Sequence, residues 1–361
     1  MGRYQKSLSW AFGQFINRTC QDISYEFDAG LCKPSRIIFC LTVRCNLTCE
    51  MCGFPRTPRT KELTTDEWKK IILELKSWIG PYRIQLAGGE VFLRQDTTEL
   101  VRFGYENDVL MGIVTNGTLI DNELAEKIAK SGLSYFDISL DGIRPATHDR
   151  IRGVDGVYQK VMTTIKYMKR HRKEIENDLS IMVATVIMGP NMGELVDLVD
   201  FAEKEDLNGI SFNPLGPPHD IGNNPQWYKD SELWPKENEL DKLDKIIDQL
   251  ILLRQKGARI LNSEDQFMAM KEYFRNPIRP MGSQCKVGVT NLLMTPKGDI
   301  HTCGLMPSIG SIEEPFHEIW RSDTAKEVRR MIKKCKRICS PGNFIYTRSI
   351  FKDIIRYLQF R

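Results

Sequence analysis

Three cysteines, Cys45, Cys49 and Cys52, form a C-x3-C-x2-C stretch that directly follows an apolar run ending at Leu41. A structural zinc ion normally takes four ligands in a closed tetrahedron. Three thiolates so close together instead suit a [4Fe–4S] cluster in which one iron has no protein ligand. Because a substrate or cofactor can bind that iron, the spacing predicts a reactive metal site. The alternatives are a zinc site completed by Cys40 and three unrelated buried thiols.

The cysteine stretch lies at the start of a region in which strand and helix patterns alternate. Short runs rich in Ile, Val, Phe or Tyr, typical of buried parallel strands, occur at about 35–41, 82–87, 109–114, 134–140, 180–187 and 208–214. Helical patterns separate these runs, and the first of them opens with a predicted capping box of Thr64 and Glu67. Six βα units in succession predict an α/β fold, a parallel sheet curling into a partial (β/α)6 TIM-type barrel.

Other unusual motifs follow the predicted strands where those strands end. They are Gly88-Gly89-Glu90 after the second strand, Thr115-Asn116-Gly117 after the third, and Ser139-Leu140-Asp141-Gly142 at the end of the fourth. In barrels of this type the active site forms at the C-terminal ends of the strands. We therefore expect these motifs to share one rim with the three cysteines.

The remaining segments are assigned by composition and by turn signals. Residues 1–34 form an N-terminal extension, 35–215 the barrel core, 216–280 a loop and helical connection, 281–343 a small C-terminal β-hairpin/helix extension, and 344–361 a basic amphipathic tail. The connection contains an expected helix at about 236–256. In the C-terminal extension, a turn sequence at 296–299 predicts the hairpin, and a single helix is expected at about 315–334.

Composition limits the class of protein. The chain has 361 residues, of which 41% are hydrophobic and 27% charged, as in globular domains, and no apolar run approaches the roughly 20 residues of a membrane span. Ten cysteines without an export signal indicate metal ligation in a reducing compartment, so we expect a cytoplasmic protein. A net charge of +4 is too small to indicate a nucleic-acid partner.

At about 35–215 the sequence resembles the radical SAM superfamily, on the cysteine spacing and the rim motifs. The resemblance implies that Cys45, Cys49 and Cys52 hold a [4Fe–4S] cluster whose open iron binds S-adenosylmethionine (SAM). It implies SAM contacts from residues Gly88, Gly89, Glu90, Asn116, Ser139, Arg152 and Leu215. Within this set, the glycines and Glu90 would contact the methionine ammonium of SAM. Arg152 would contact the SAM carboxylate, and we prefer it over Arg150 for this role. Asp141 is a weaker candidate for a SAM contact.

The C-terminal cysteines resemble the Twitch or SPASM extension of the same superfamily. The implied ligands of one auxiliary [4Fe–4S] cluster are Cys285, Cys303, Cys335 and Cys339. The implied reaction is reductive cleavage of SAM to a 5′-deoxyadenosyl radical, which abstracts a substrate hydrogen. An electron donor such as flavodoxin or ferredoxin would supply the electron.

Three questions stay open at this level. The substrate is expected to be a small molecule, sugar or lipid, because only about 34 residues precede the first strand, too few for a leader-peptide-binding domain. The alternatives are a peptide maturase and, in a different class, a non-catalytic zinc-binding protein. The tail is expected either to dock on the barrel or to contact an anionic membrane surface. Trp227, Tyr228 and Trp234 are expected to form either a substrate lid or the packing core of their own loop.

Overall fold

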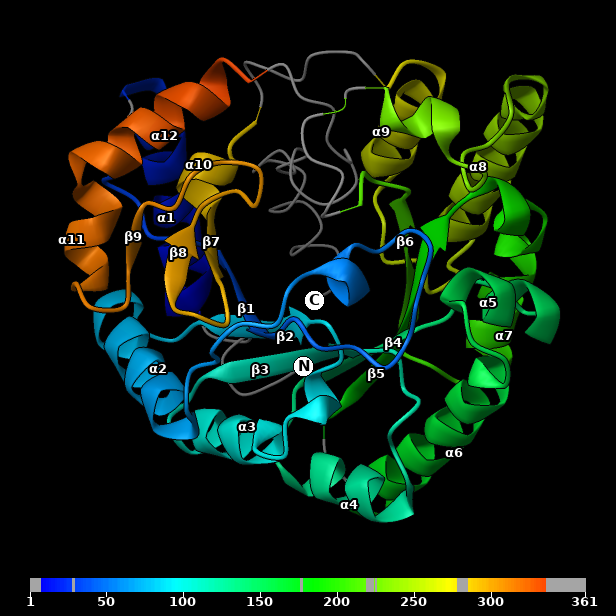
Figure 1. The fold of residues 1–361 in the computed structure, drawn as a ribbon, viewed down its shortest axis with the longest axis horizontal. Helices are drawn as coiled ribbons and strands as arrows, with labels where there is room; N and C mark the ends of the chain where they lie inside the picture. Colours follow the sequence, from blue (N-terminus) through cyan, green and yellow to red (C-terminus); the bar gives the residue numbers. More distant parts are fainter. Residues whose placement is uncertain are drawn as a thin grey trace.

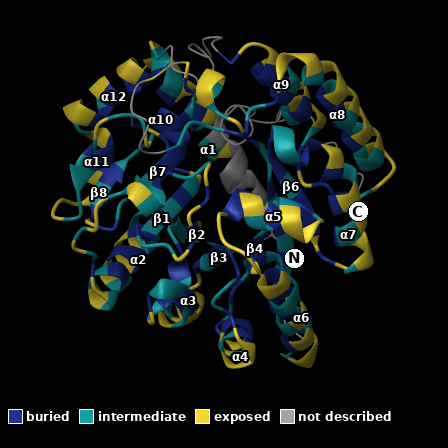
Figure 2. Cartoon of the chain, turned by 45° about the vertical axis from the view of Figure 1, so that its right-hand side comes forward, coloured by how far each residue is buried: buried dark blue, intermediate teal, exposed yellow. Residues whose placement is uncertain are grey.

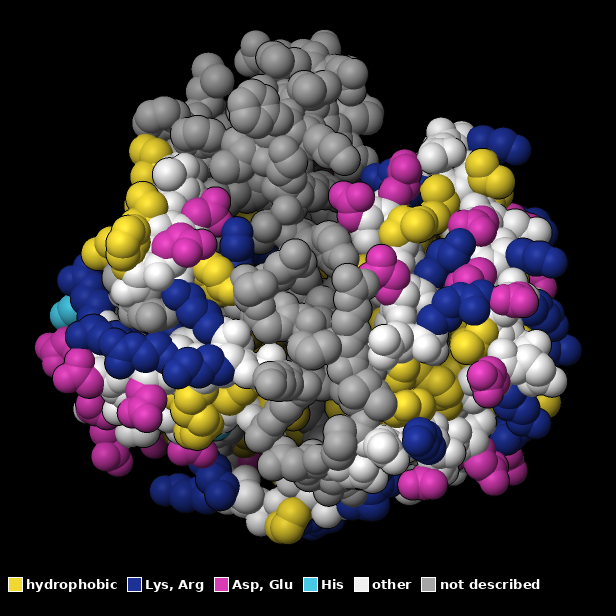
Figure 3. All heavy atoms as spheres, turned by 90° about the horizontal axis from the view of Figure 1, so that it is seen from above, with side chains coloured by type: hydrophobic (Ala, Val, Ile, Leu, Met, Phe, Trp, Pro, Cys, Tyr) yellow, Lys and Arg dark blue, Asp and Glu magenta, His cyan; other side chains and the backbone are white. Residues whose placement is uncertain are grey.

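The computed structural model describes residues 8–27, 30–175, 178–218, 224, 226–277 and 285–335. The predicted cluster ligand Cys339 and the amphipathic tail at 344–361 lie outside these residues. Within the described part of the chain, no helix is both long and apolar enough to cross a membrane. On the face drawn in Figure 3, basic and acidic side chains are interspersed over the described residues.

The barrel strands lie side by side in chain order and pair in parallel, which confirms the predicted partial barrel (Figure 1). They are β1 (Arg36–Thr42), β2 (Arg83–Gly88), β3 (Leu110–Thr115), β4 (Tyr135–Ser139), β5 (Ser180–Ile187) and β6 (Gly209–Pro214). Each begins within about one residue of the apolar run that predicted it, because a run buried on both faces can only be a sheet interior. The described part of the sheet does not close, since its order runs from β6 to β1 and on to β7, β8 and β9.

The helices of the βα units cover the outer, convex face of this sheet (Figure 1). They are α2 (Thr65–Ile79), α3 (Thr97–Glu106), α4 (Asn122–Lys130), α5 (Pro145–Arg152), α6 (Val157–Ile175) and α7 (Leu195–Lys204). The capping box of α2 is present, because Thr64 Oγ1 accepts from the Glu67 N–H and Glu67 accepts from the Thr64 N–H.

Strand residues alternate between a buried and a half-buried set (Figure 2). In β4, Phe136 and Ile138 are fully buried and belong to the main core, whereas Asp137 and Ser139 are half-buried. The same alternation runs through β5. Since neighbouring residues of a strand point to opposite faces, the half-buried set lines the inner, concave face.

The C-terminal extension continues the barrel sheet. β7 (Asn291–Met294) and β8 (Asp299–His301) form the predicted antiparallel hairpin, and β9 (Gly310–Ser311) pairs with β8. β7 also pairs in parallel with β1, a contact that the hairpin pattern did not predict. The single helix predicted at about 315–334 was wrong. α11 (Phe316–Arg321) ends at Ser322, whose extended backbone and Oγ cap α12 (Asp323–Lys333) by accepting from the Ala325 N–H.

The N-terminal extension contains a helix, α1 (Leu8–Phe27), for which the sequence analysis predicted no element. It packs on the C-terminal extension: α1 contacts α10 (Val287–Thr290), and Asp22 pairs with Lys286 at 2.6 Å. The connection forms α8 (Leu240–Gln255) and α9 (Glu264–Arg275), with a parallel bridge between Ile210 and Ile260 extending the sheet beyond β6.

Candidate active site

The cysteine stretch follows β1 and lies on the rim formed by the C-terminal strand ends. Cys49 is buried, and Cys45 and Cys52 are half-buried. Burial raises the pKa of all three thiols, and the charge of Cys49 raises the pKa of Cys45 and Cys52 further. The three sulfurs are therefore near neighbours that would remain protonated without a positive partner. Iron supplies such a charge, because metals bind the deprotonated thiolate.

Two glycines after β2 allow the strand end to approach the cysteine stretch. A Cβ on Gly89 would lie 2.0 Å from the Arg44 carbonyl oxygen, and one on Gly88 would lie 2.4 Å from that of Thr42. The Gly89 N–H donates to the Thr42 carbonyl and the Glu90 N–H to that of Arg44, both at 2.8 Å. The resemblance predicted that these glycines admit SAM. In the structure, the absence of their side chains allows close approach of the backbone at Thr42 and Arg44, which leads into Cys45.

Glu90 and Asn116 tie the rim loops together. The buried Glu90 carboxylate accepts from Thr115 Oγ1 at 2.7 Å and from the Asn116 N–H at 2.8 Å. Burial raises the pKa of Glu90, although these hydrogen bonds oppose the shift. Asn116 Nδ2 donates to Asn46 Oδ1 at 2.9 Å, beside Cys45. Both residues thus reach the cysteine stretch, as the rim prediction required.

The rim at β4 holds a buried ion pair. Arg152 Nη2 lies 2.6 Å from Asp141 Oδ2. Arg152 lies beside Cys49, because the next residue, Gly153, accepts from Thr48 Oγ1 at 3.0 Å, and the Arg152 charge opposes the rise in the pKa of Cys49. Arg152 Nε is buried and has no partner within the described residues, so the guanidinium keeps one donor for a bound anion. Arg150, the rejected alternative, is exposed and lies 4.0 Å from Glu232. Arg152, and not Arg150, therefore lies next to the cysteine stretch.

Asp141 and Ser139 differ in what they can contact. Asp141 is fully buried between Arg152 and the backbone of β5, and it therefore offers no free surface for a SAM contact. Ser139 is half-buried on the inner face, and its hydroxyl makes no hydrogen bond with the described part of the chain. Ser139 is therefore open to a ligand.

The opposite side of the rim is apolar. Leu215 belongs to a second buried cluster with Ile151, Met188 and Trp227, and Met51 of the cysteine stretch packs against this cluster. The Leu215 N–H donates to the Ile187 carbonyl, and its own carbonyl accepts from Tyr273 Oη at 2.9 Å. One lone pair of the Leu215 carbonyl remains for the predicted SAM contact.

The aromatic residues after β6 pack against one another. The ring of Trp234 lies 5.5 Å from that of Trp227 and 5.1 Å from those of Tyr228 and Phe274. This arrangement agrees with the packing-core interpretation of these residues.

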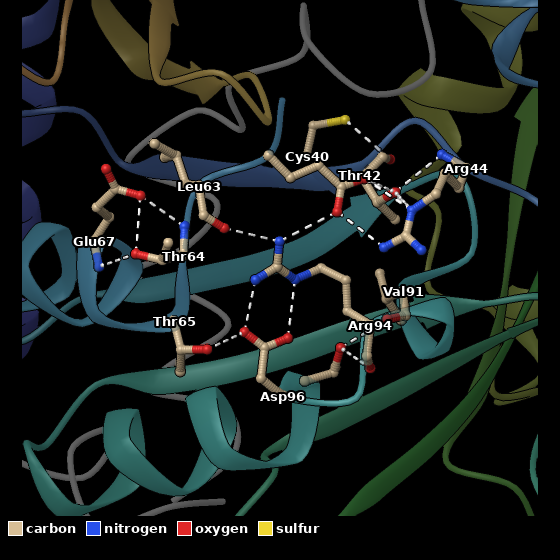
Figure 4. Close-up of polar contacts among 12 residues, drawn as sticks. Cys40, Thr42, Arg44, Leu63, Thr64, Thr65, Glu67, Val91, Arg94 and Asp96 are labelled. Atoms are coloured by element: carbon tan, nitrogen blue, oxygen red, sulfur yellow. Dashed lines mark hydrogen bonds and ion pairs between the residues drawn. The ribbon is translucent and has the colours of Figure 1, made fainter. Parts of the chain in front are cut away.

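A charged network on the β1 side was missed by the sequence analysis. Glu62 accepts from Arg44 Nε and Nη2 at 3.0 and 2.9 Å, and Arg94 Nη1 lies 3.4 Å from it (Figure 4). Arg94 also binds Asp96 through two nitrogens, at 3.0 and 2.6 Å. These side chains line an open groove of about 520 Å³. No local pattern marks Glu62, because its partners lie 18 and 32 residues away.

Three of the four predicted auxiliary ligands come together. Burial raises the pKa of Cys285, and the charges of Cys303 and Cys335 raise it further, so these three thiols are neighbours. Cys32 and Cys40, the second of which was the fourth ligand in the zinc alternative, donate to backbone carbonyls at 3.2 and 3.6 Å.

The donor set fits iron–sulfur clusters better than single ions. Among the described residues, no three His, Cys, Asp or Glu side chains are arranged to hold one metal ion, so the zinc alternative has no candidate site there. A cluster of four irons spreads its thiolate ligands wider than one ion does. The buried thiols and the free donor of Arg152 fit a cluster with a carboxylate-bearing ligand beside it.

Comparisons with known proteins agree with this geometry. The radical SAM superfamily profile matches residues 39–202, and the SPASM iron–sulfur cluster-binding domain matches residues 285–341. The AdoMet-dependent heme synthase of Methanosarcina barkeri is 27% identical over 80% of this chain and 82% of its own length. The PqqA peptide cyclase of Bradyrhizobium diazoefficiens is 26% identical over 78% of this chain and 69% of its own length.

A solved structure shares the fold. The crystal structure of Streptococcus suis SuiB bound to precursor peptide SuiA superposes with a TM-score of 0.65 at 17% identity, covering 96% of this chain and 83% of that one. The chain belongs to the radical SAM superfamily, whose cofactors are SAM and a [4Fe–4S] cluster, and it carries a C-terminal SPASM iron–sulfur cluster-binding domain.

Proposed function

We propose that this chain is a radical SAM maturase that oxidises a peptide, with Cys45, Cys49 and Cys52 as ligands of the SAM-binding cluster. The electrostatic interaction of Cys49 with the half-buried Cys45 and Cys52 on the rim supports this ligand set. When bound and reduced, the cluster supplies the electron that cleaves SAM to methionine and a 5′-deoxyadenosyl radical, which takes a hydrogen atom from the substrate.

The protein's own residues bind and orient SAM. Arg152 offers its free N–H to the SAM carboxylate, and Ser139 and Asn116 offer polar groups to the carboxylate or ribose. Gly88, Gly89 and Glu90 brace the cysteine stretch from the β2 side. The cluster around Leu215 provides an apolar wall that excludes water.

The auxiliary site is proposed to hold its cluster through Cys285, Cys303, Cys335 and Cys339. With four thiolate ligands, no iron is left for substrate. The remaining roles are structural support and transfer of an electron from the substrate radical. Electron transfer suits an oxidation, in which the substrate loses a hydrogen atom to the 5′-deoxyadenosyl radical and then an electron and a proton, with one SAM consumed per turnover.

A peptide is the favoured substrate because two relatives with peptide products or substrates in their names, the PqqA peptide cyclase and the subtilosin biosynthesis protein AlbA of Bacillus subtilis, match 78% and 80% of this chain. The solved structure that shares the fold is also bound to a precursor peptide. A tetrapyrrole is the second candidate, since a heme synthase matches over a similar length. The expectation of a small-molecule substrate survives only in this second form.

The first experiment tests the cluster. Anaerobically reconstituted protein with dithionite and SAM should form 5′-deoxyadenosine, and the Cys49→Ala variant should form none above the level without enzyme. Cys40→Ala is the matched control, because Cys40 is a half-buried thiol that donates to the backbone carbonyl of Thr42, two residues further along the chain. Equal turnover by the Cys49→Ala variant would refute the ligand assignment.

The second experiment tests the substrate class. Short peptides encoded beside the gene and Fe-coproporphyrin III are added separately to the reduced enzyme, and 5′-deoxyadenosine formation and substrate mass are followed. A peptide that loses two mass units while stimulating turnover supports the maturase. Stimulation by the tetrapyrrole alone supports the second candidate.

A further inference from the structure

We propose that Asp141 and Arg152 act as one buried unit that raises the reduction potential of the barrel cluster through Cys49, separately from any contact of Arg152 with SAM. The inference rests on the proposed function, since it takes Cys49 to be a cluster ligand. Arg152 lies beside the ligand, and Asp141 is a positioning residue.

Asp141 is fixed from several sides. Its Oδ1 accepts from the Val186 N–H at 2.8 Å, and its carbonyl accepts from Asn191 Nδ2 at 2.7 Å. Its N–H donates to His148 Nδ1 at 3.0 Å. Asp141 is completely buried and Arg152 is 8% exposed, so the 2.6 Å ion pair between them is shielded from water. A carboxylate held this firmly fixes the guanidinium that it binds.

The fixed guanidinium faces the cluster ligands. The residue after Arg152, Gly153, accepts from Thr48 Oγ1 at 3.0 Å, which places Arg152 beside Cys49. The Arg152 charge acts on the thiols of Cys49 and Cys52. Hydrogen bonds to sulfur and the net charge nearby set the potential of iron–sulfur clusters. Because reduction adds an electron to the cluster, a donor and a positive charge at the ligand sulfur favour the reduced state.

His148 adds no charge to this arrangement. Burial and the charge of Arg152 lower the pKa of His148 to about 2, so the ring is neutral. Since Nδ1 accepts from the Asp141 N–H, the ring proton is on Nε2. The positive charge at Cys49 therefore comes from Arg152.

The same rim offers a matched control. Glu194 is also buried and accepts from the backbone N–H groups of Ile143 and Arg144 at 2.8 and 2.9 Å. It pairs with Arg144 at 2.6 Å, but the Arg144 side chain is 68% exposed. The pair repeats the chemistry of Asp141 and Arg152 without an interaction with Cys45, Cys49 or Cys52.

The test removes each pair as a unit, which keeps the local net charge unchanged. The Asp141→Asn/Arg152→Met variant and the Glu194→Gln/Arg144→Met control are titrated by EPR at controlled potential, without SAM. A variant with Cys45, Cys49 and Cys52 replaced by Ala supplies the auxiliary signal for subtraction. At the wild-type midpoint, the first variant should show about a tenfold lower ratio of reduced to oxidised barrel cluster, equivalent to about 59 mV for one electron.

The control pair should keep the wild-type midpoint. An unchanged midpoint in the Asp141→Asn/Arg152→Met variant with full iron content would overturn the inference, as would an equal shift in the control. If the Asp141→Asn/Arg152→Met variant does not assemble its barrel cluster, the same EPR titration is carried out on the Asp141→Glu variant. It keeps both charges but displaces the guanidinium, so an unchanged midpoint there also refutes the inference. Failure of wild type to bind a barrel cluster would instead refute the proposed function.

Discussion

Two acid–arginine networks hold the cysteine stretch from opposite sides, and they differ in burial. On the β1 side, Arg44, Glu62 and Arg94 have side chains that are 36%, 16% and 8% exposed (Figure 4). On the β4 side, Asp141 and Arg152 are 0% and 9% exposed. The chemical groups are the same, and Arg94 is as buried as Arg152, but Glu62 and Arg44 are more exposed than Asp141.

The difference decides what each network can do. Ion pairs near water contribute little individually, because water solvates each charge about as well as its partner does. Glu62 interacts with three residues, Arg44, Thr42 and Arg94. Each of these residues also has a further polar partner, so that losing Glu62 leaves none of them without one. In the buried pair, each charge has lost its hydration, and removing one partner leaves the other uncompensated. Removing one residue of the β1-side network should therefore destabilise the protein little, whereas removing one residue of the buried pair should destabilise it strongly.

The largest effect is expected from breaking the buried pair on one side. The Asp141→Asn variant should be destabilised by about 3–5 kcal/mol, because the Arg152 charge stays buried without its partner. Urea unfolding of anaerobically purified protein measures this. Adding Arg152→Met should restore most of the lost stability, and a double variant as unstable as the single one would contradict the pair model.

A smaller effect is expected at the glycine that lets β2 approach the stretch. The Gly89→Ala variant should lose about 1–3 kcal/mol and part of its iron, because the new Cβ would collide with the Arg44 carbonyl. Thermal unfolding and iron analysis measure the two losses. Gly193→Ala is the control, since a Cβ there would meet nothing within 4 Å. Equal losses in both variants would mean that the close approach at Gly89 is not responsible.

Replacing Glu62 in the β1-side network should lower the stability less than replacing Asp141 does. Burial would raise the pKa of Glu62, but hydrogen bonds from Arg44 and Thr42 outweigh it and the pKa is lowered. Its contribution is therefore present above its unfolded pKa and is lost as pH falls through the folded value. Glu62→Gln should cost about 1 kcal/mol at pH 7, less in high salt, and nothing in acid. A loss as large as that of Asp141→Asn would remove the distinction between the networks.

Asp137 shows what happens to an acid on the inner face without such a network. Burial raises its pKa to about 6, with Arg83 opposing, and within the described residues it has no hydrogen bond or ion pair. The folded state thus favours the protonated acid, so stability falls as pH rises from about 4 to 6. Asp137→Asn should be more stable than wild type by about 1 kcal/mol at pH 7 and equal to it below pH 4. Melting temperatures across this range provide the check, and a constant difference would refute it.

The sequence by itself determined the features that depend on neighbours along the chain. Short runs rich in Ile, Val, Phe or Tyr marked β1 to β6, because the residues that face the core of a parallel sheet are apolar. The capping box of Thr64 and Glu67 marked the start of α2 because its partners are three residues apart. The spacing of Cys45, Cys49 and Cys52 singled out the metal chemistry for the same reason.

Only the tertiary structure decided the contacts between distant segments. The pairing of β7 with β1 joins residues more than 250 positions apart, and α1 reaches the C-terminal extension across a similar distance. The partners of Glu62, and the approach of Gly89 to the Arg44 carbonyl, depend on how loops from different strands meet at the rim. Whether Asp141 faces SAM or Arg152 depends on burial, which is set by packing in three dimensions and has no fixed offset along the chain.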